Sequence, residues 1–135
     1  MWNHERILFK QFDAPTDIIF DGKYIVVIDS VGMHFVDYRS QLSEFNDGFI
    51  PEQNYELDIE KTIALTGHSV CYFNDKYYIT DSEQFNTLQV VTYSNGIESL
   101  ITLPEVMYSN IVNINGWIWF VSKNKKVDIY EQVLY

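Results

Sequence analysis

The residue types that most often carry chemistry are few and scattered in this sequence. The three histidines are His4, His34 and His68, and none of their spacings matches a metal site or an HExxH motif. His68 and Ser69 could suggest a base and a nucleophile, but adjacent strand residues point to opposite faces and cannot meet directly. The single cysteine, Cys71, stands between apolar residues and is expected in the core. We therefore predict no catalytic residue, no metal ligand and no cofactor.

Carboxylates offer the remaining route to catalysis. Asp29 with Asp37, and Asp81 with Glu83, lie at the ends of expected strands. A glycoside hydrolase needs two such groups facing each other across a cleft, so a hydrolase stays an alternative that only a structure can test. The chain lacks the ligand ladder of a calcium loop and a glycine-rich phosphate loop.

Aromatic side chains are the strongest chemical signal. The ten tyrosines and three tryptophans outnumber the core positions that a chain of 135 residues offers. Tyrosine and tryptophan are favoured at interfaces, and their rings also stack on sugars. Packing inside the fold is the alternative for Trp119, and loosely held chain ends are the alternative for Trp2 and Tyr135. The candidate binding residues are Trp2, Tyr78, Tyr108, Trp119 and Tyr135.

The formal net charge of −10 argues against direct binding of nucleic acid, because cations must replace the counterions released from the phosphates. An acidic surface is most often a solubility device, and less often a partner for a basic protein surface. The N-terminus lacks the apolar run of a signal peptide, and no apolar stretch approaches the roughly 20 residues of a membrane span. We expect a cytoplasmic protein without membrane contact.

Short runs rich in valine, isoleucine and aromatic residues alternate with turn signals, which is typical of strands. We expect a single all-β domain, residues 1–135. The expected strands are 7–12, 17–20, 23–29, 33–38, 55–63, 68–73, 76–81, 87–93, 97–103, 110–114, 117–122 and 127–130, with loops at 39–54 and 104–109.

Three of the expected hairpins resemble one another. Each has a turn pair that adopts positive φ at low cost, and these pairs are Asp21-Gly22, Asn74-Asp75 and Asn115-Gly116. Each has an aromatic residue opening its second strand: Tyr24, Tyr77 and Trp117, spaced 53 and 40 residues apart. If the 39–54 loop accounts for the longer interval, the unit is about forty residues, the length of a four-stranded propeller blade.

The second strands of these hairpins are apolar on both faces. Ile25 and Val27 alternate with other apolar residues in 23–29, as Ile118 and Phe120 do in 117–122. An antiparallel sheet with one wet face would alternate apolar and polar residues. These strands are therefore expected between neighbouring sheets.

The middle of the chain resembles β-propeller repeat proteins of the WD-repeat type. Leu65-Thr66-Gly67-His68 is similar to the Gly-His opening of that repeat, Phe73–Ser82 to its central hairpin and Thr87–Val91 to its third strand. Thr92-Tyr93 stands where that repeat has Trp-Asp. The resemblance implies blade-like sheets, and no functional residue is carried over from it.

Three blades are too few for a closed ring, because propellers usually have four to eight. We expect an antiparallel all-β fold of about three blade-like sheet repeats, forming a partial propeller or one completed by oligomerisation. A β-sandwich or barrel is the alternative.

The expected function is a non-enzymatic module for protein–protein interaction, with a homo-oligomer or a glycan as further partners that the sequence allows. One alternative is a carbohydrate-binding, adhesin-like module of a phage or other particle. The others are an acidic inhibitor of a nucleic-acid-binding protein, of the anti-defence type, and a hydrolase.

Overall fold

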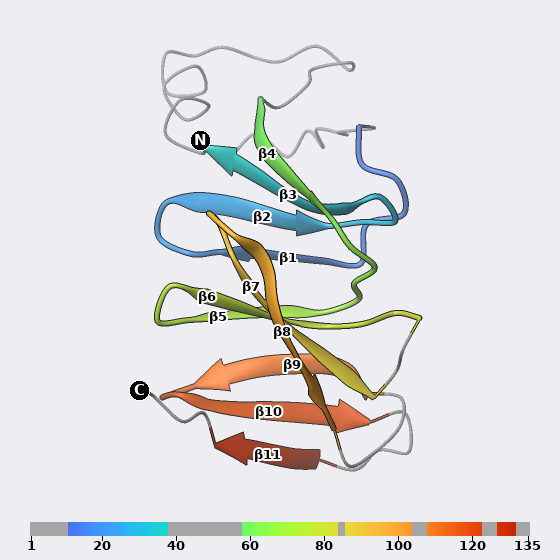
Figure 1. The fold of residues 1–135 in the computed structure, drawn as a ribbon, viewed down its shortest axis with the longest axis vertical. Helices are drawn as coiled ribbons and strands as arrows, with labels where there is room; N and C mark the ends of the chain where they lie inside the picture. The colour runs from blue at the N-terminus through green and yellow to red at the C-terminus, as the bar shows by residue number, and fades with distance from the viewer. Residues whose placement is uncertain (1–10, 38–57, 84–85, 104–107, 123–126, 132–135) are drawn as a thin grey trace, which may run out of the picture.

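The computed structural model describes residues 11–37, 58–83, 86–103, 108–122 and 127–131, and only the backbone of 108–109, 122 and 127–131. Within these ranges the chain forms strands and no helix, so none of the described segments offers a helix that could cross a membrane. The strands form three antiparallel sheets that follow one another in chain order (Figure 1). The prediction of an antiparallel all-β fold is confirmed.

Each sheet is a meander in which neighbours in sequence are neighbours in space. The first contains β1 (Asp17–Phe20), β2 (Tyr24–Ile28), β3 (Gly32–Asp37) and β4 (Ile59–Ala64). The second contains β5 (Val70–Phe73), β6 (Lys76–Thr80), β7 (Thr87–Thr92) and β8 (Gly96–Thr102). The third contains β9 (Tyr108–Ile114), β10 (Trp117–Ser122) and β11 (Val127–Glu131). Because no sheet of the described residues closes on itself, the barrel alternative is wrong.

Most predicted strands match the observed ones to within two residues. Tyr108 and Ser109, expected in a loop, belong to β9. The loop predicted at 39–54 lies outside the described residues, as does most of the strand predicted at 7–12. Gln11 and Phe12, the described end of that segment, are not in a strand.

Two of the three predicted hairpin turns have the expected backbone angles at both residues, whereas in Asp21-Gly22 only Gly22 has a positive φ, of 101°. Asn74 and Asp75 have φ values of 52° and 65°, and Asn115 and Gly116 have 53° and 87°. Positive φ at both central residues matches the right-handed twist of the flanking strands, which explains the choice of Asn, Asp and Gly.

The predicted aromatic repeat is shifted by one residue in the second sheet. The residue after the two-residue turn is Tyr24 in β2, Lys76 in β6 and Trp117 in β10. Tyr77 stands one place later, and a shift of one residue moves a side chain to the other face of a sheet. Tyr24 and Tyr77 therefore point into the same layer from opposite sides, and are not equivalent positions.

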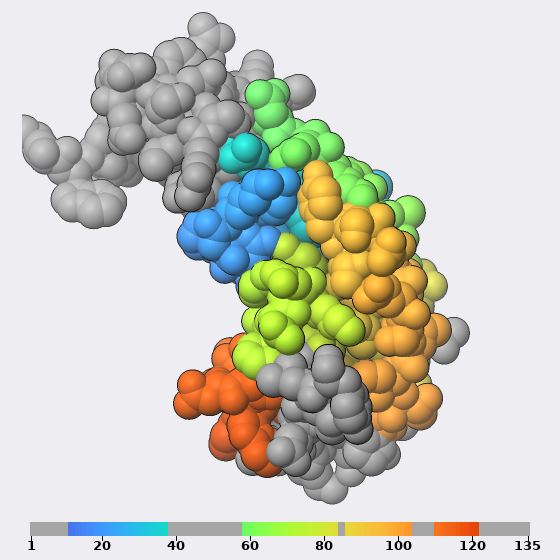
Figure 2. Space-filling view, turned by 60° about the vertical axis from the view of Figure 1, so that its left-hand side comes forward, coloured from blue at the N-terminus to red at the C-terminus, as the bar shows by residue number. Residues whose placement is uncertain are grey.

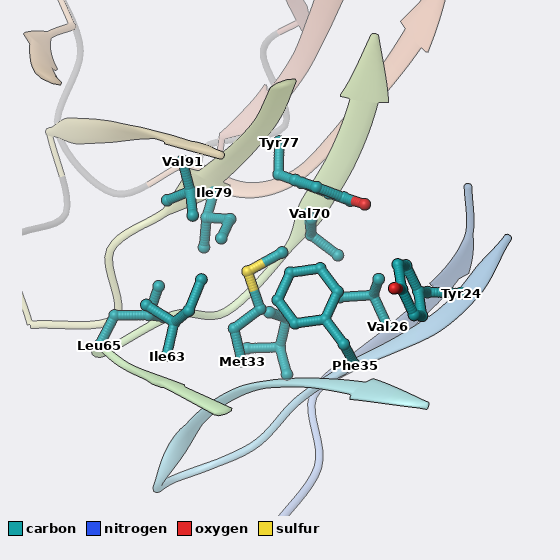
Figure 3. Close-up of a cluster of buried hydrophobic side chains, with 11 residues drawn as sticks. Tyr24, Val26, Met33, Phe35, Ile63, Leu65, Val70, Tyr77, Ile79 and Val91 are labelled. Carbon is teal, nitrogen blue, oxygen red and sulfur yellow. The ribbon is translucent and has the colours of Figure 1, made fainter. Parts of the chain in front are cut away.

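Two apolar layers hold the three sheets together. The layer between the first and second sheets surrounds Phe35 and Met33 from β3 (Figure 3). The layer between the second and third sheets includes Leu88, Ile118 and Phe120. The second sheet is thus covered on both faces. Val27, Ile118 and Phe120 are buried and Ile25 is half-buried. The prediction that β2 and β10 each lie between two sheets is wrong for the described residues, because each packs against a neighbouring sheet on one face only, and Trp117 on the other face of β10 is 43% exposed.

A series of hydrogen bonds connects the first strands of the three sheets. The Asp17 carboxylate in β1 accepts hydrogen bonds from the Val70 N–H (2.9 Å) and from the Ser69 hydroxyl (3.0 Å). The Ser69 hydroxyl in turn accepts a bond from the Ile111 N–H of β9 (3.1 Å). These bonds fix the order in which β1, β5 and β9 lie beside one another. Figure 2 shows the three hairpins in blue, yellow-green and orange following one another along one side of the molecule.

Candidate binding groove

A groove of about 680 Å³ opens between the first and second sheets, at the end where their hairpins turn. The turns β1–β2, β5–β6 and β7–β8 form its rim. Four tyrosines line it: Tyr24, Tyr72, Tyr77 and Tyr93. Tyr24 and Tyr77 are buried and form the floor, while Tyr72 and Tyr93 are half-buried and form the walls.

Asp21 positions the floor of the groove. One oxygen of its carboxylate accepts hydrogen bonds from the N–H groups of Lys23 (2.8 Å) and Tyr24 (2.6 Å), which closes the β1–β2 turn. The other oxygen accepts a hydrogen bond from the Tyr77 hydroxyl of β6. The same carboxylate therefore shapes the first turn and joins it to the second sheet.

The aromatic rings support one another. Tyr24 and Tyr93 stack in parallel with their ring centroids 5.1 Å apart, and the edge of Phe35 meets the Tyr93 ring at 4.9 Å. The Tyr72 hydroxyl donates a hydrogen bond to Asp75 at 3.0 Å, and its ring lies 4.9 Å from that of Tyr77. The walls and the floor thus form one aromatic cluster with defined ring orientations.

Lysine side chains of the chain itself lie over two of the tyrosine rings. The Nζ atoms of Lys23 and Lys61 lie 4.9 Å and 4.6 Å from the ring centroids of Tyr24 and Tyr93. Ammonium groups at such distances are drawn to the electron-rich ring face. The charged side chains that line the groove are three carboxylates, those of Asp21, Asp75 and Glu98, and two lysines, Lys23 and Lys76. Ring faces and carboxylates together make a site suited to a cationic group.

The phenols of the groove stay protonated at neutral pH. The hydrogen bond that Tyr93 donates to Tyr24, together with burial, raises the pKa of Tyr93 to about 12. Burial and the hydrogen bond to Asp21 raise the pKa of Tyr77 above its ordinary value. The groove therefore presents neutral hydroxyls to a ligand.

These raised pKa values predict alkaline unfolding. A phenol with a higher pKa in the folded than in the unfolded chain stabilises the fold below the unfolded pKa of about 10, and this stabilisation is lost as pH rises towards 12. When the native protein is titrated with base, the absorbance of tyrosinate should therefore appear at a higher pH than it does for free tyrosine. It should rise together with the loss of the near-ultraviolet circular dichroism signal. Full ionisation of all ten tyrosines near pH 10 in a chain that remains folded would contradict this expectation.

The residues predicted from the sequence are not brought together in one site. Trp2 and Tyr135 lie outside the described residues, and Tyr108 is described only by its backbone at the start of β9. Tyr78 was expected near the surface, but it is only 6% exposed, because it lies on the face of β6 that packs against the third sheet. Trp119 is half-buried on the outward face of β10.

Tyr24 and Tyr77 were predicted only as hairpin residues, and none of the four groove tyrosines was predicted as a binding residue. The available signal was that Tyr24 and Tyr77 each stand next to a hairpin turn carrying an aspartate.

One carboxylate of each pair considered for hydrolysis has structural partners. Asp29 accepts hydrogen bonds from His34 and from the N–H groups of its own turn, and Asp81 accepts them from Thr66 and Glu83. Asp37 is the last residue of β3, whereas Asp29 lies in the turn before β3 begins. Among the described side chains, no group of three His, Cys, Asp or Glu residues could hold a metal ion.

Comparisons with known proteins add a fold relationship. No family model and no curated protein matches this chain. Among solved structures it is similar to PorZ, an essential bacterial surface component of the type-IX secretion system of Porphyromonas gingivalis, with a TM-score of 0.64 and 10% sequence identity. The match covers 87% of this chain and 15% of the PorZ chain. At this identity the likeness shows a shared fold alone.

Proposed function

We propose that the chain is a non-enzymatic binding module whose three sheets are successive blades of a propeller-like scaffold. The meander topology of each sheet supports this, as does the succession of β1, β5 and β9 as neighbouring first strands. The resemblance of residues 65–91 to WD repeats is consistent with it. The fold likeness to PorZ, itself a surface component of a secretion system, is compatible with a binding role.

The binding site in this proposal is the tyrosine groove, and its ligand is a cationic segment of a protein partner. The observation that carries the assignment is the pairing of tyrosine ring faces with carboxylates in one groove of about 680 Å³. Lys23 and Lys61 of the chain itself already use two of these rings as ammonium contacts. A lysine or arginine side chain of a partner would find ring faces and carboxylates in the same place.

A labelled peptide rich in lysine and arginine tests this assignment by fluorescence anisotropy, with a glutamine-substituted peptide as the neutral reference. The wild type should bind the cationic peptide, and binding should weaken as salt is added. Tyr72→Ala and Glu98→Gln should each weaken it about fivefold or more, which corresponds to about 1 kcal/mol.

Glu83→Gln is the matched control, because Glu83 is an exposed carboxylate in the β6–β7 turn, at the other end of the second sheet. It should leave the affinity unchanged. An equal loss in the Glu83 and Glu98 variants would mean that net charge, and not the groove, holds the peptide.

The half-buried rings of Tyr72 and Tyr93 also favour the carbohydrate-binding alternative, because tyrosine rings stack on sugar faces and carboxylates accept sugar hydroxyls. A glycan array separates the two functions. Binding of a neutral glycan that does not change with salt and that disappears in Tyr72→Ala would support the carbohydrate-binding module.

A further inference from the structure

The first and third sheets lie at opposite ends of the stack, so one face of each has no neighbouring sheet among the described residues (Figure 1). Each sheet begins with a hairpin of the same geometry, in which a two-residue turn follows the first strand. Positions counted back from these turns can therefore be compared across the three sheets.

One position in each first strand points back towards the preceding sheet. It is occupied by Ile18 in β1, Val70 in β5 and Ile111 in β9, all at the same distance from the turn. Val70 and Ile111 are only 2% and 8% exposed, because they pack against the sheet before their own. Ile18 is 62% exposed. The first sheet thus carries an apolar side chain that a preceding sheet covers in both other cases.

A second set of positions points forward towards the following sheet. In the second sheet these are Cys71 and Tyr78, which are 5% and 6% exposed because the third sheet covers them. Val112 and Trp119 occupy the same register positions in the third sheet. Val112 is 50% exposed and Trp119 is half-buried. The third sheet thus carries the pair with which the second sheet contacts its neighbour.

The hydrogen bonds between first strands follow the same repeat. A side chain of one first strand accepts a bond from a backbone N–H of the next, at 2.9 Å between β1 and β5 and at 3.1 Å between β5 and β9. The acceptors are Asp17 and Ser69. Asn110 has the same position in β9, is exposed, and offers an amide oxygen as acceptor. The matching donor at the other end is the N–H of Ile18, which bonds the carboxylate of the adjacent Asp17 at 2.8 Å.

We propose that a second copy of this chain adds head to tail, so that its β1 covers β9 and β10 of the first copy. The two halves of the contact that joins sheets within the chain are both exposed, one at each end, and a further copy supplies the missing half to either end. The contact is made through the first strand, because Val27, His34 and Val36 on the outer face of the first sheet are already buried. First strands also adjoin within the chain, β1 beside β5 and β5 beside β9.

Light scattering coupled to size-exclusion chromatography tests the proposal. A contact that uses a different surface on each partner adds copies until a ring closes, so the wild type should have the mass of two chains or more. Ile18→Glu and Val112→Glu should each have the mass of one chain, because every contact would then bury an unpaired carboxylate. Leu100→Glu is the matched control and should keep the wild-type mass, since Leu100 is 64% exposed on β8, outside both surfaces.

Mixing the two glutamate variants gives the sharpest result. Ile18→Glu keeps an intact third sheet and Val112→Glu keeps an intact β1, so an equimolar mixture can form one contact and should have the mass of two chains. A mixture with the mass of one chain overturns the proposal. Retention of the wild-type mass by either glutamate variant alone also overturns it, because two third sheets or two first sheets would then pack against each other. A wild type with the mass of one chain at high concentration overturns it as well.

Ile18→Ala and Val112→Ala keep the proposal falsifiable if a glutamate variant fails to fold. Both shorten exposed side chains and leave no cavity in the single chain, and each should raise the dissociation constant about tenfold. Unchanged association in both would overturn the proposal. Added salt should strengthen the association, because it screens the repulsion between chains that each carry a net charge of −10. Association that weakens with salt would contradict an apolar contact.

Discussion

Replacing Phe35 with alanine is expected to lower the free energy of unfolding by about 3–5 kcal/mol. Phe35 is completely buried at the centre of the layer between the first two sheets (Figure 3). Its ring meets those of Tyr24, Tyr77 and Tyr93 edge to face, at centroid distances of 5.7, 5.4 and 4.9 Å. Alanine removes all of these contacts and leaves a cavity that the surrounding strands can close only in part. Urea denaturation followed by circular dichroism measures the loss.

The same substitution reports on the groove, because the three tyrosines that rest on Phe35 also line it. We expect weaker binding of the cationic peptide in Phe35→Ala, since the rings lose the support that fixes their orientation. Phe120→Ala is the control: Phe120 is equally buried but lies in the second layer. It should cost similar stability and leave peptide binding intact. Equal losses of binding in both variants would show that general loosening, and not the groove, is responsible.

The strands and turns were predictable because their causes are local. Asn74-Asp75 and Asn115-Gly116 adopt positive φ whatever surrounds them, and they separate runs of residues that favour extended backbone. The apolar character of both faces of β2 and β10 also predicted that sheets would stack. These properties belong to a few consecutive residues and can be seen without knowing the rest of the fold.

The binding surface was not predictable, because it depends on which face of each strand is covered. Tyr78 and Trp119 occupy equivalent register positions, yet the third sheet buries Tyr78 while Trp119 remains half-exposed. The groove likewise depends on contacts between distant residues, such as that of Tyr77 with Asp21. Tyr24 and Tyr77 looked equivalent in the sequence because each stands close to a hairpin turn. A shift of one residue between the two hairpins puts them on opposite faces of their sheets, so that they face each other.

Replacing Asp29 with alanine is expected to lower the free energy of unfolding by about 3 kcal/mol. The substitution removes a buried carboxylate and leaves the several groups that donate hydrogen bonds to it unsatisfied. Asp29 is 2% exposed. It accepts hydrogen bonds from His34 (2.7 Å) and from the N–H groups of Asp13, Val31 and Gly32 at 2.9 to 3.0 Å. His34 is held on its other side by the Thr62 hydroxyl at 2.9 Å. The carboxylate therefore joins the β2–β3 turn, β3 and the segment before β1.

The effect of Asp29 should depend on pH. Burial opposes its ionised form, but the hydrogen bonds from His34 and the three N–H groups outweigh burial and hold the pKa below its usual value of 3.8. A lowered pKa stabilises the fold above the unfolded pKa, and this stabilisation is lost as pH falls through the folded pKa. The difference in unfolding free energy between the wild type and Asp29→Asn should therefore narrow below about pH 4.

Asp81→Ala supplies the comparison with Asp29→Ala, because Asp81 follows β6 as Asp29 follows β2, yet it is only half-buried. Its described hydrogen bonds come from the Thr66 hydroxyl (2.7 Å) and the Glu83 N–H (2.8 Å). We expect a smaller loss of about 1 kcal/mol, since solvent can satisfy what the substitution leaves unpaired. The difference in unfolding free energy between the wild type and Asp29→Asn could instead stay constant from neutral to acid pH. The shape of the Asp29 side chain, and not its charge, would then explain how it stabilises the fold. The hydrogen bonds around His34 would then add no more to the stability of the fold than the hydrogen bonds of an ordinary turn.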